Sequence, residues 1–462
     1  MIIDRASAND VMSVAVDRGC VPMHLGAVLV LDPGASPSVP ALEQVLRERV
    51  PRVPRLHRRL VRTPLGCGRP VWVADRDFEV TAHLQAVELA GLAGPADADD
   101  APVPRAVLDA TADAVMARLP ADRPPWRVRA LVDADGRVRA VVVVLHHVLA
   151  DGIGGLAVLG ALADGAATSP ADRAGRADPP PGRQRSSSVT RPERAPSWTD
   201  LARDAWSERA RALRHLPSAP RRLRGSAAEL GLGRPALVPA TSLLRPTGPH
   251  RRLDLVCVPL SDVHQAGRAA GGTVNDVVVA AVAGALATLA CSRGERLPEV
   301  VVSVPVSGRA SATTAALGNE VGVLPVRVPT AGDPAARLAA VVAETARLGA
   351  DGRRGGSAAL LTPAFRLLAA VGVFQRFVSA QRLVHTFETD VRGPAVPLSL
   401  AGATVTSIAP VAVNPGNVTV SFDVLSYAGE LAVTVVSDPD LVPDHGVLLE
   451  ALRGELRALS AR

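Results

Sequence analysis

Residues 141–152 read Val-Val-Val-Val-Leu-His-His-Val-Leu-Ala-Asp-Gly, and the rest of the chain is interpreted outward from them. The valine run is typical of a buried β-strand, and the small residues at 153–156 (Ile-Gly-Gly-Leu) indicate a helix after a short polar turn. Two histidines at the end of a buried strand are costly unless they have partners or a chemical role. A general base at the mouth of a channel has this arrangement, with the carboxylate of Asp151 bracing nearby groups.

Two other interpretations of this turn compete with the catalytic one. Most histidines are ordinary surface or core residues, and His146 and His147 with Asp151 could also form half of a metal site. The sequence contains no HExxH or CxxC motif and no second dense cluster of His, Cys and Asp, which argues against a metal. The choice between catalysis and an ordinary structural role therefore depends on the remaining sequence.

Composition narrows the class of protein. The chain has 462 residues, a length that suggests two domains, and 48% of them are hydrophobic, enough for sizeable cores. Aromatic residues make up only 2%, so the cores must be built from Ala, Val and Leu. The net charge of +6 suits a phosphorylated cofactor, anionic lipid or nucleic acid. Nucleic acid is the weakest of these, because no binding motif is present and few rings are available to stack on bases.

Cysteine use and the N-terminus bear on the compartment. The cysteines at positions 20, 67, 257 and 291 show no pairing pattern, as expected for free thiols in a reducing compartment. The N-terminus lacks the basic and apolar regions of a secretory signal, and the longest uncharged apolar stretch, residues 277–291, is short for a membrane span. We therefore expect a cytoplasmic protein, soluble or peripheral at the inner face of the plasma membrane.

Strand and helix patterns divide the chain into three parts. An alternating N-terminal domain covers residues 1–165, a linker rich in Pro, Ser and Arg with a crossover helix covers 166–235, and a second alternating domain covers 236–462. We expect strands at residues 24–32, 71–75, 126–132, 138–145, 253–260, 300–306, 321–328, 403–408, 417–426 and 431–437. We expect helices at residues 40–50, 104–119, 198–215, 277–290, 335–348 and 444–461.

Further motifs occur in a fixed order along the chain. They are residues 22–26 (PMHLG), 69–73 (RPVWV), 124–126 (PPW), 146–152 (HHVLADG), 272–277 (GTVNDV), 304–309 (VPVSGR), 317–319 (LGN), 392–394 (RGP), 427–429 (YAG) and 442–444 (VPD). Together they resemble the bacterial wax ester synthase/diacylglycerol acyltransferase family over nearly the full length outside residues 166–235. The sequence departs from the family pattern at four places: Pro125 stands for a leucine, Asp390 stands for an asparagine, residues 241–246 lack the usual asparagine, and residues 11–12 (Val-Met) replace a large aromatic residue.

The resemblance implies an α/β fold with mixed sheets, in which two chloramphenicol acetyltransferase-like domains enclose a channel. It also implies an O-acyltransferase that moves a long-chain acyl group from acyl-CoA to diacylglycerol or a fatty alcohol, with acyl-CoA as co-substrate and no cofactor or metal. By resemblance, His147 is the general base and His146 orients the site or supports the loop. Asp151 is expected to fix the loop by pairing with an arginine, and Gly152 to let the backbone turn close to the substrate.

Five further residues are candidates for the channel, each with a simpler alternative. Trp126 is either a core residue or a substrate wall, with the core favoured. Asn275 and Asp276 stand at an expected helix start, so capping or packing is favoured over a place near the channel. Ser307 and Arg309 follow an expected strand and face the CoA channel or bond within a loop.

Three functional hypotheses remain open at the level of sequence. The first is the neutral-lipid acyltransferase, and the second is a same-fold enzyme that uses a specialised-metabolite hydroxyl or a carrier-protein thioester. The third is a catalytically silent lipid-binding protein, against which the intact histidine motif argues. Apolar residues interspersed with arginine at 358–384 indicate either a packed helix pair or a peripheral membrane or lipid-droplet surface.

Overall fold

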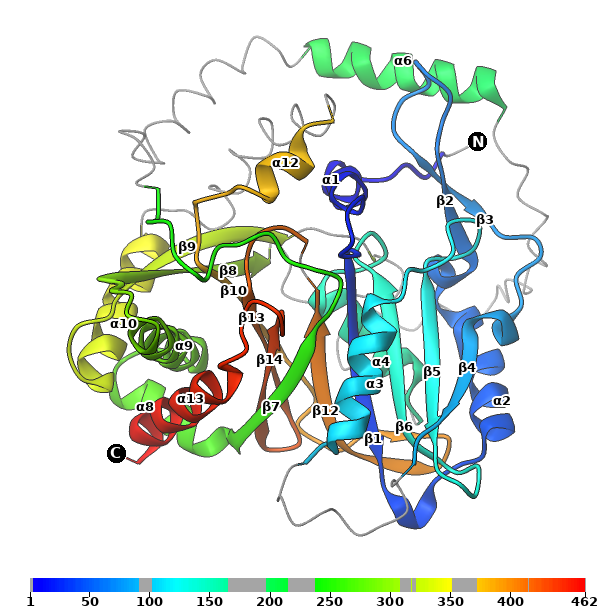
Figure 1. Cartoon of the computed structure of the whole chain (residues 1–462). Helices are drawn as coiled ribbons and strands as arrows, with labels where there is room; N and C mark the ends of the chain where they lie inside the picture. The colour runs from blue at the N-terminus through cyan, green and yellow to red at the C-terminus, as the bar shows by residue number, and fades with distance from the viewer. Residues whose placement is uncertain are drawn as a thin grey trace, which may run out of the picture.

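Two six-stranded mixed β-sheets lie side by side in the computed structural model, which describes residues 3–90, 102–164, 197–214, 237–307, 317, 321–350, 372–413 and 415–461 (Figure 1). The N-terminal sheet has the strand order β11 (Ser399–Leu400), β12 (Ala403–Ala412), β1 (His24–Leu31), β6 (Val138–His146), β5 (Trp126–Val132) and β4 (Leu84–Glu88). The C-terminal sheet has the order β7 (Arg252–Pro259), β14 (Glu430–Ser437), β13 (Val420–Tyr427), β10 (Thr386–Arg392), β8 (Glu299–Ser307) and β9 (Val321–Pro329). The expected α/β class with mixed sheets is confirmed.

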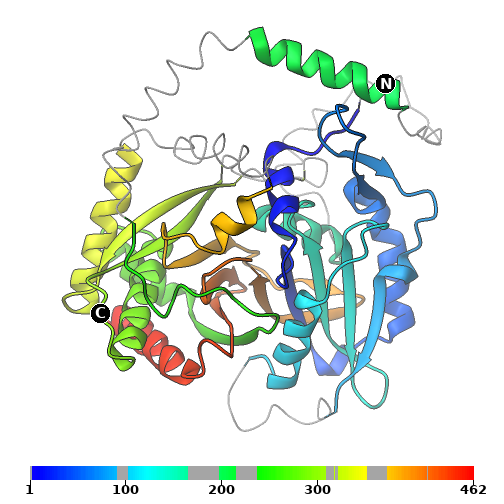
Figure 2. The ribbon, with the colours of Figure 1, turned by 45° about the horizontal axis from the view of Figure 1, so that its top comes forward.

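The N-terminal sheet is completed by a strand from the far end of the chain. β12 pairs antiparallel with β1, with Leu25 opposite Ala412, and β1 pairs antiparallel with β6, with Leu25 opposite Leu145. β12 also packs against β13 and β14 of the other sheet. Residues 403–412 thus belong in space with the N-terminal domain, although they lie in the C-terminal half of the sequence (Figures 1 and 2).

The C-terminal sheet combines parallel and antiparallel neighbours. β10 runs parallel to both β8 and β13, whereas β9, β14 and β7 are joined by antiparallel ladders. Every residue of β13 is buried, as expected for a strand covered on both faces. One face of β13 packs into the helix-covered core through Phe422 and Val424, and the other meets the N-terminal domain through Leu425 and Tyr427.

Helices pack against both sheets (Figure 2). Around the N-terminal sheet lie α1 (Ala8–Val16), α2 (Val39–Arg49), α3 (Arg105–Met116) and α4 (Gly152–Leu162), with the short 3-10 turns Pro33–Ala35, Val50–Arg52, Pro54–His57 and Val80–His83. Around the C-terminal sheet lie α8 (Leu260–Ala269), α9 (Val274–Ser292), α10 (Pro334–Ala350), α12 (Phe374–Val378) and α13 (His445–Ser460). α3 packs between the sheets, where Val107 and Val115 share a core with β1, β6, β12, β7 and β14.

Helix α9 is long and apolar enough to cross a membrane by length and composition. It is instead the central helix of the C-terminal core, and its residues from Val277 to Ala283 have no exposed surface. A run of Val and Ala suits this place, because small side chains let α10 and α13 pack closely around it.

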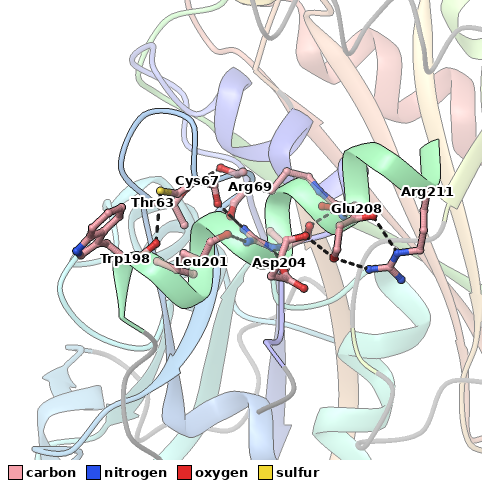
Figure 3. A network of polar contacts seen from close by, with 12 residues as sticks. Thr63, Cys67, Arg69, Trp198, Leu201, Asp204, Glu208 and Arg211 are labelled. Atoms are coloured by element: carbon pink, nitrogen blue, oxygen red, sulfur yellow. Dashed lines mark hydrogen bonds and ion pairs between the residues drawn. The ribbon is translucent and has the colours of Figure 1, made fainter. Parts of the chain in front are cut away.

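Helix α6 (Trp198–Arg214) lies across the small hairpin formed by β2 (Arg58–Val61) and β3 (Val71–Ala74). Arg5 donates to Asp204 at 2.5 Å and to the carbonyl of Leu201 at 2.9 Å, and Arg69 forms an ion pair with Glu208 (Figure 3). The crossover helix expected between the domains is therefore present and attached to the N-terminal domain. The rest of the expected linker, residues 166–196 and 215–235, lies outside the described residues.

Most expected elements are present with ends shifted by a few residues. The strands that were not expected are β2, β4, β10 and β11, and the unexpected helices include α1 and α8. The most consequential of these is β10, because it forms the middle of the C-terminal sheet. Its sequence, Thr-Phe-Glu-Thr-Asp-Val-Arg, carries two carboxylates and so lacks the apolar run of a buried strand.

Replacing Gly26 with alanine is expected to destabilise the N-terminal sheet by about 1–3 kcal/mol. A Cβ atom at residue 26 would lie 2.5 Å from the carbonyl oxygen of Val143 on the neighbouring strand, and a backbone atom inside a sheet cannot easily move away. Gly160 in α4 is the matched control, because a Cβ atom there would have no heavy atom within 4 Å and alanine favours a helix. Thermal unfolding should show a lower midpoint for Gly26→Ala and an equal or higher one for Gly160→Ala. Equal midpoints for the two variants would contradict the close strand approach.

Candidate active site

The two histidines leave β6 on a turn that backbone hydrogen bonds hold from both sides. The amide of His146 donates to the carbonyl of Pro125 at 2.9 Å, and that of His147 donates to the carbonyl of Met23 at 2.9 Å. Asp151 then begins α4 as its N-cap, since its Oδ1 accepts from the amide of Gly154 at 2.8 Å. The turn is therefore fixed by the strands before it and the helix after it.

His146 supports this turn. Its Nδ1 accepts from the amide of Val148 at 3.0 Å, which places the proton of the neutral ring on Nε2. Nε2 then donates to Asp17 Oδ2 at 3.2 Å. Burial alone would raise the pKa of Asp17, but the hydrogen bond from His146 and the charge of Arg118 outweigh it and lower this pKa to about 2. With both nitrogens engaged, His146 is a positioning group rather than a base.

His147 is the histidine that lines the space between the domains. Burial lowers the pKa of His147 below its ordinary value and outweighs the opposing hydrogen bond to its own backbone; His146 lowers this pKa further, and Asp151 raises it slightly. Because this backbone hydrogen bond favours the protonated ring, the His147 ring must be the donor and its own carbonyl oxygen the acceptor. The second ring nitrogen then carries the lone pair, so at neutral pH His147 is a neutral base.

An apolar pocket lies beside His147 and is shared by the two sheets. With its open mouth it encloses about 700 Å³. Its N-terminal wall comes from β1, β6, β12 and α4, and its C-terminal wall from β10 and β13. The lining residues are Leu25, Gly26, Ala27, Val143, Leu145, His147, Gly152, Gly155, Leu156, Leu159, Thr389, Val391, Pro410, Val411, Ala412, Asp423 and Leu425. His147, Thr389 and Asp423 are the polar side chains of this lining, so the pocket suits an apolar chain with its polar atoms near the histidine.

Two polar side chains of the far wall bond to each other. Thr389 Oγ1 lies 2.8 Å from Asp423 Oδ1, and the amide of Ala412 donates to Asp423 Oδ2 at 2.6 Å. Burial raises the pKa of Asp423 to about 7, although both hydrogen bonds act to lower it. A carboxyl group at this position is therefore neutral for a large part of the time near pH 7.

Asn275 and Asp276 lie behind this wall rather than in the pocket. Asp276 closes a capping box with Thr273 at the start of α9 and also accepts from Thr345 Oγ1 at 2.8 Å. In the amide orientation that satisfies its neighbours, Asn275 donates to both carboxyl oxygens of Glu388, at 3.1 and 3.2 Å. Glu388 alternates with Thr389 along β10 and so points to the opposite face of the sheet.

The remaining candidate residues are placed as follows. Trp126 is a core residue, 2% exposed, that donates from Nε1 to the carbonyl of Leu56 at 2.8 Å and stacks on His83. Ser307 ends β8 and is described by its backbone only, and Arg309 lies outside the described residues. An arginine partner of Asp151 stays a prediction. Among the described residues, no group of three His, Cys, Asp or Glu side chains could hold a metal ion.

Sequence reasoning missed the whole C-terminal side of the pocket. Thr389, Val391 and Asp423 lie on strands β10 and β13, whose contact with α4 depends on pairing between distant segments. Asp17 was also missed, because an aspartate after a helix gives no sign of a histidine partner. The one available signal was Asp390, where the sequence departs from the pattern of the family that it resembles; burial raises the pKa of this carboxyl to about 6.

Solved structures define the class of fold. The wax ester synthase/diacylglycerol acyltransferase from Marinobacter aquaeolei VT8 matches with a TM-score of 0.62 at 18% identity, over 99% of this chain and 100% of that one. The first condensation domain of the calcium-dependent antibiotic synthetase, in complex with substrate analogue 3a, matches with a TM-score of 0.62 at 21% identity, over 100% and 97%. The chain thus has the predicted two-domain chloramphenicol acetyltransferase-like fold.

Sequence comparison is more specific. Residues 7–278 match the wax ester synthase/diacylglycerol acyltransferase catalytic domain, and residues 317–460 match the C-terminal domain of the same family. A Mycobacterium tuberculosis (strain ATCC 25618 / H37Rv) protein named "Probable diacyglycerol O-acyltransferase tgs1" is 30% identical over 455 residues, which cover 96% of this chain and 93% of that protein. The chain belongs to the wax ester synthase/diacylglycerol acyltransferase family, a family of acyltransferase enzymes.

Gly152 is expected to be needed because the C-terminal domain approaches it closely. A Cβ atom at residue 152 would lie 2.9 Å from Val391 Cγ2, so Gly152→Ala would push the two walls of the pocket apart. We expect Gly152→Ala to lower activity about tenfold or more, and the second change Val391→Ala, which removes the clashing methyl groups, to restore much of it. Steady-state rates and unfolding midpoints of the single and double variants measure this. No rescue by Val391→Ala would show that Gly152 acts through backbone conformation instead.

Proposed function

We propose that this protein transfers a long-chain acyl group from acyl-CoA to the hydroxyl group of a lipid acceptor, with diacylglycerol preferred and fatty alcohol as the alternative. The observation that carries the proposal is His147, a neutral base at the end of an apolar pocket that both domains line. The family relationship supports the reaction class, and the mycobacterial relatives named as diacylglycerol O-acyltransferases support the acceptor.

The reaction needs one proton to move twice. His147 takes the proton of the acceptor hydroxyl as its oxygen attacks the thioester carbonyl carbon, and a C–O bond forms while the carbonyl oxygen becomes negative. Collapse of this tetrahedral species breaks the C–S bond, and the CoA thiolate takes the proton from His147. The products are an ester and free CoA, no covalent enzyme intermediate is required, and the base ends neutral. A lowered pKa suits His147 to the first step, because the ring must be unprotonated when the acceptor binds.

The pocket walls support a long apolar substrate. A second apolar gap begins at Val143 and Leu159, which also line the first pocket, and continues along the same face of the N-terminal sheet between α2 and α4. It is lined by Leu29, Leu42, Leu46, Val128, Val141, Val143, Leu159, Leu162, Ala163, Ser399, Leu400 and Val405. This gap is small, so the support for a long acyl chain is the apolar lining of the pocket beside His147, with which a longer chain makes more contact.

Acyl-CoA as donor has support from a protein of the same fold. A mutant of the starter condensation domain of rhizomide synthetase RzmA was solved in complex with C8-CoA and matches with a TM-score of 0.62 at 15% identity. The fold therefore accommodates an acyl-CoA. A carrier-protein thioester is the alternative donor, and direct comparison of the two donors would decide between them.

Three expectations from the sequence stay predictions. They are the absence of a cofactor, the cytoplasmic location and a peripheral contact with membrane or lipid droplets. Most of residues 358–384, the segment that motivated the membrane contact, lies outside the described residues, and in its described part Phe374 of α12 is buried. Flotation with anionic liposomes tests the contact, and the absence of co-flotation at low salt would contradict it.

Replacing His147 with alanine is expected to lower acyl transfer by about 10²- to 10⁴-fold, because the acceptor then loses its base. The measurement is release of free thiol from palmitoyl-CoA with diacylglycerol or hexadecanol as acceptor. His264→Ala is the control, since His264 is exposed on α8 of the C-terminal domain and is expected to leave the rate unchanged. Release that survives His147→Ala would contradict the role of this residue. A folded wild type that releases thiol with neither acceptor would contradict the lipid substrate.

A further inference from the structure

The pocket wall opposite His147 carries a pair of polar side chains that the reaction as proposed so far does not use. Thr389 on β10 and Asp423 on β13 are direct partners in the parallel ladder, and Thr389 Oγ1 is 2.8 Å from Asp423 Oδ1. Both line the pocket, and Asp423 is only 2% exposed. A buried carboxyl group in an apolar wall is costly, so its presence calls for a physical role.

Strand register places this pair at the histidine end of the pocket. Asp423 Oδ2 accepts from the amide of Ala412, and Ala412 lies opposite Leu25, which in turn lies opposite Leu145. The next row of the same sheet joins His24 to His146, directly before His147. The Thr389–Asp423 pair therefore faces the part of the pocket where a thioester attacked with the help of His147 has to lie.

The direction of the hydrogen bond between the two side chains depends on one proton. An ionised Asp423 only accepts, so Thr389 must give its hydroxyl proton to the carboxylate and can offer only lone pairs to the pocket. In the protonated state Oδ2 still accepts from Ala412, so the proton belongs on Oδ1 and is donated to Thr389 Oγ1. The hydroxyl proton of Thr389 is then free to point into the pocket.

We propose that Asp423 is a positioning residue which, in its protonated state, turns the hydroxyl group of Thr389 into the pocket as a hydrogen-bond donor for the substrate oxygen that becomes negative during acyl transfer. This inference rests on the proposed function. In this role Asp423 acts through Thr389 and does not touch the substrate. The rate then depends on the ionisation of Asp423 as well as on that of the base, His147. A donor aimed in advance at a developing oxyanion is among the largest single contributions to such reactions.

The proposal sets an upper limit on the pH at which the enzyme works well. Burial raises the pKa of Asp423 to about 7, whereas burial lowers that of His147. Activity should therefore rise with pH as His147 loses its proton and fall again as Asp423 ionises. Other groups around Asp423 are the carboxyls of Glu388 and Asp390 on β10 and the neutral hydroxyl of Thr434 opposite it on β14. Burial raises the pKa of Glu388 well above its ordinary value, so Glu388 stays neutral in the range where Asp423 ionises.

The decisive variant is Asp423→Asn. Its amide can accept from Ala412 and donate to Thr389 at every pH, as the protonated acid does. We expect its kcat at pH 6.5 to stay within a few-fold of the wild type, and the fall of kcat between pH 7 and 9 to disappear.

Asp423→Leu, of similar size but without hydrogen bonds, should lower kcat at all pH values. Thr389→Val should lower kcat by about 10²- to 10³-fold with little effect on KM, and Thr389→Ser should restore it.

The outcomes separate a positioning role from a purely structural one. A structural role would lower kcat equally at every pH, so an unchanged alkaline fall in Asp423→Asn would overturn the proposal. Full activity of Thr389→Val would overturn it as well.

Infrared difference spectra between wild type and Asp423→Asn give a readout without substrate. A protonated carboxyl band at pH 6 that is lost by pH 9 supports the proposal, and its absence at pH 6 contradicts it. This readout holds even if the wild type fails with lipid acceptors, so failure of the proposed function would be recognised separately.

Discussion

Strand β12 pairs with β1 from Leu25–Ala412 to Val30–Ser407, and in doing so it brings the C-terminal half of the chain into the N-terminal sheet. Because β12 also packs on β13 and β14, this ladder fixes the distance and angle between the two sheets. The pocket between the two sheets depends on this arrangement. Its N-terminal wall carries His147, and its C-terminal wall carries Thr389 and Asp423. The amide of Ala412 on β12 donates to Asp423. The ladder holds β12 in the N-terminal sheet, so this bond from Ala412 to Asp423 joins the two walls directly.

Burial explains why the pKa values of the two titratable groups in the pocket shift in opposite directions. Removal from water disfavours the charged form of any side chain, so the same environment lowers the pKa of His147 and raises that of Asp423. Both groups are consequently biased to their neutral states at neutral pH. His146 takes no part in the chemistry, because the carboxylate of Asp17 binds its Nε2. An apolar substrate path and a neutral base thus have a common cause, the burial of the pocket lining between the two sheets.

The fold class and the histidine turn could be predicted from the sequence because their signals are local. The valine run before His146, the Asp151–Gly152 step and the alternating strands after residue 236 each depend on neighbours within a few positions. The far wall of the pocket could not be predicted, because its strand β10 carries Glu388 and Asp390 and so resembles an exposed loop. Glu388 is tolerated in the core through the amide of Asn275 on α9, a contact that only the folded chain brings about. The pairing of β12 with β1 could not be predicted either, because the position of a strand along the chain does not reveal which sheet it joins.

The late position of β12 in the sequence also has a consequence for how the protein is made. About 370 residues separate the end of β1 from the start of β12, so a ribosome working at roughly 5–20 residues per second takes on the order of half a minute to supply the missing strand. During that interval the nascent N-terminal domain exposes the unpaired edge of β1, a strand of mostly apolar residues that could join a neighbouring chain. Expression of the N-terminal half alone leaves this edge open permanently. The whole chain is therefore the natural unit of folding for this enzyme. Until β12 has been made, the open edge of β1 has to be kept away from other chains.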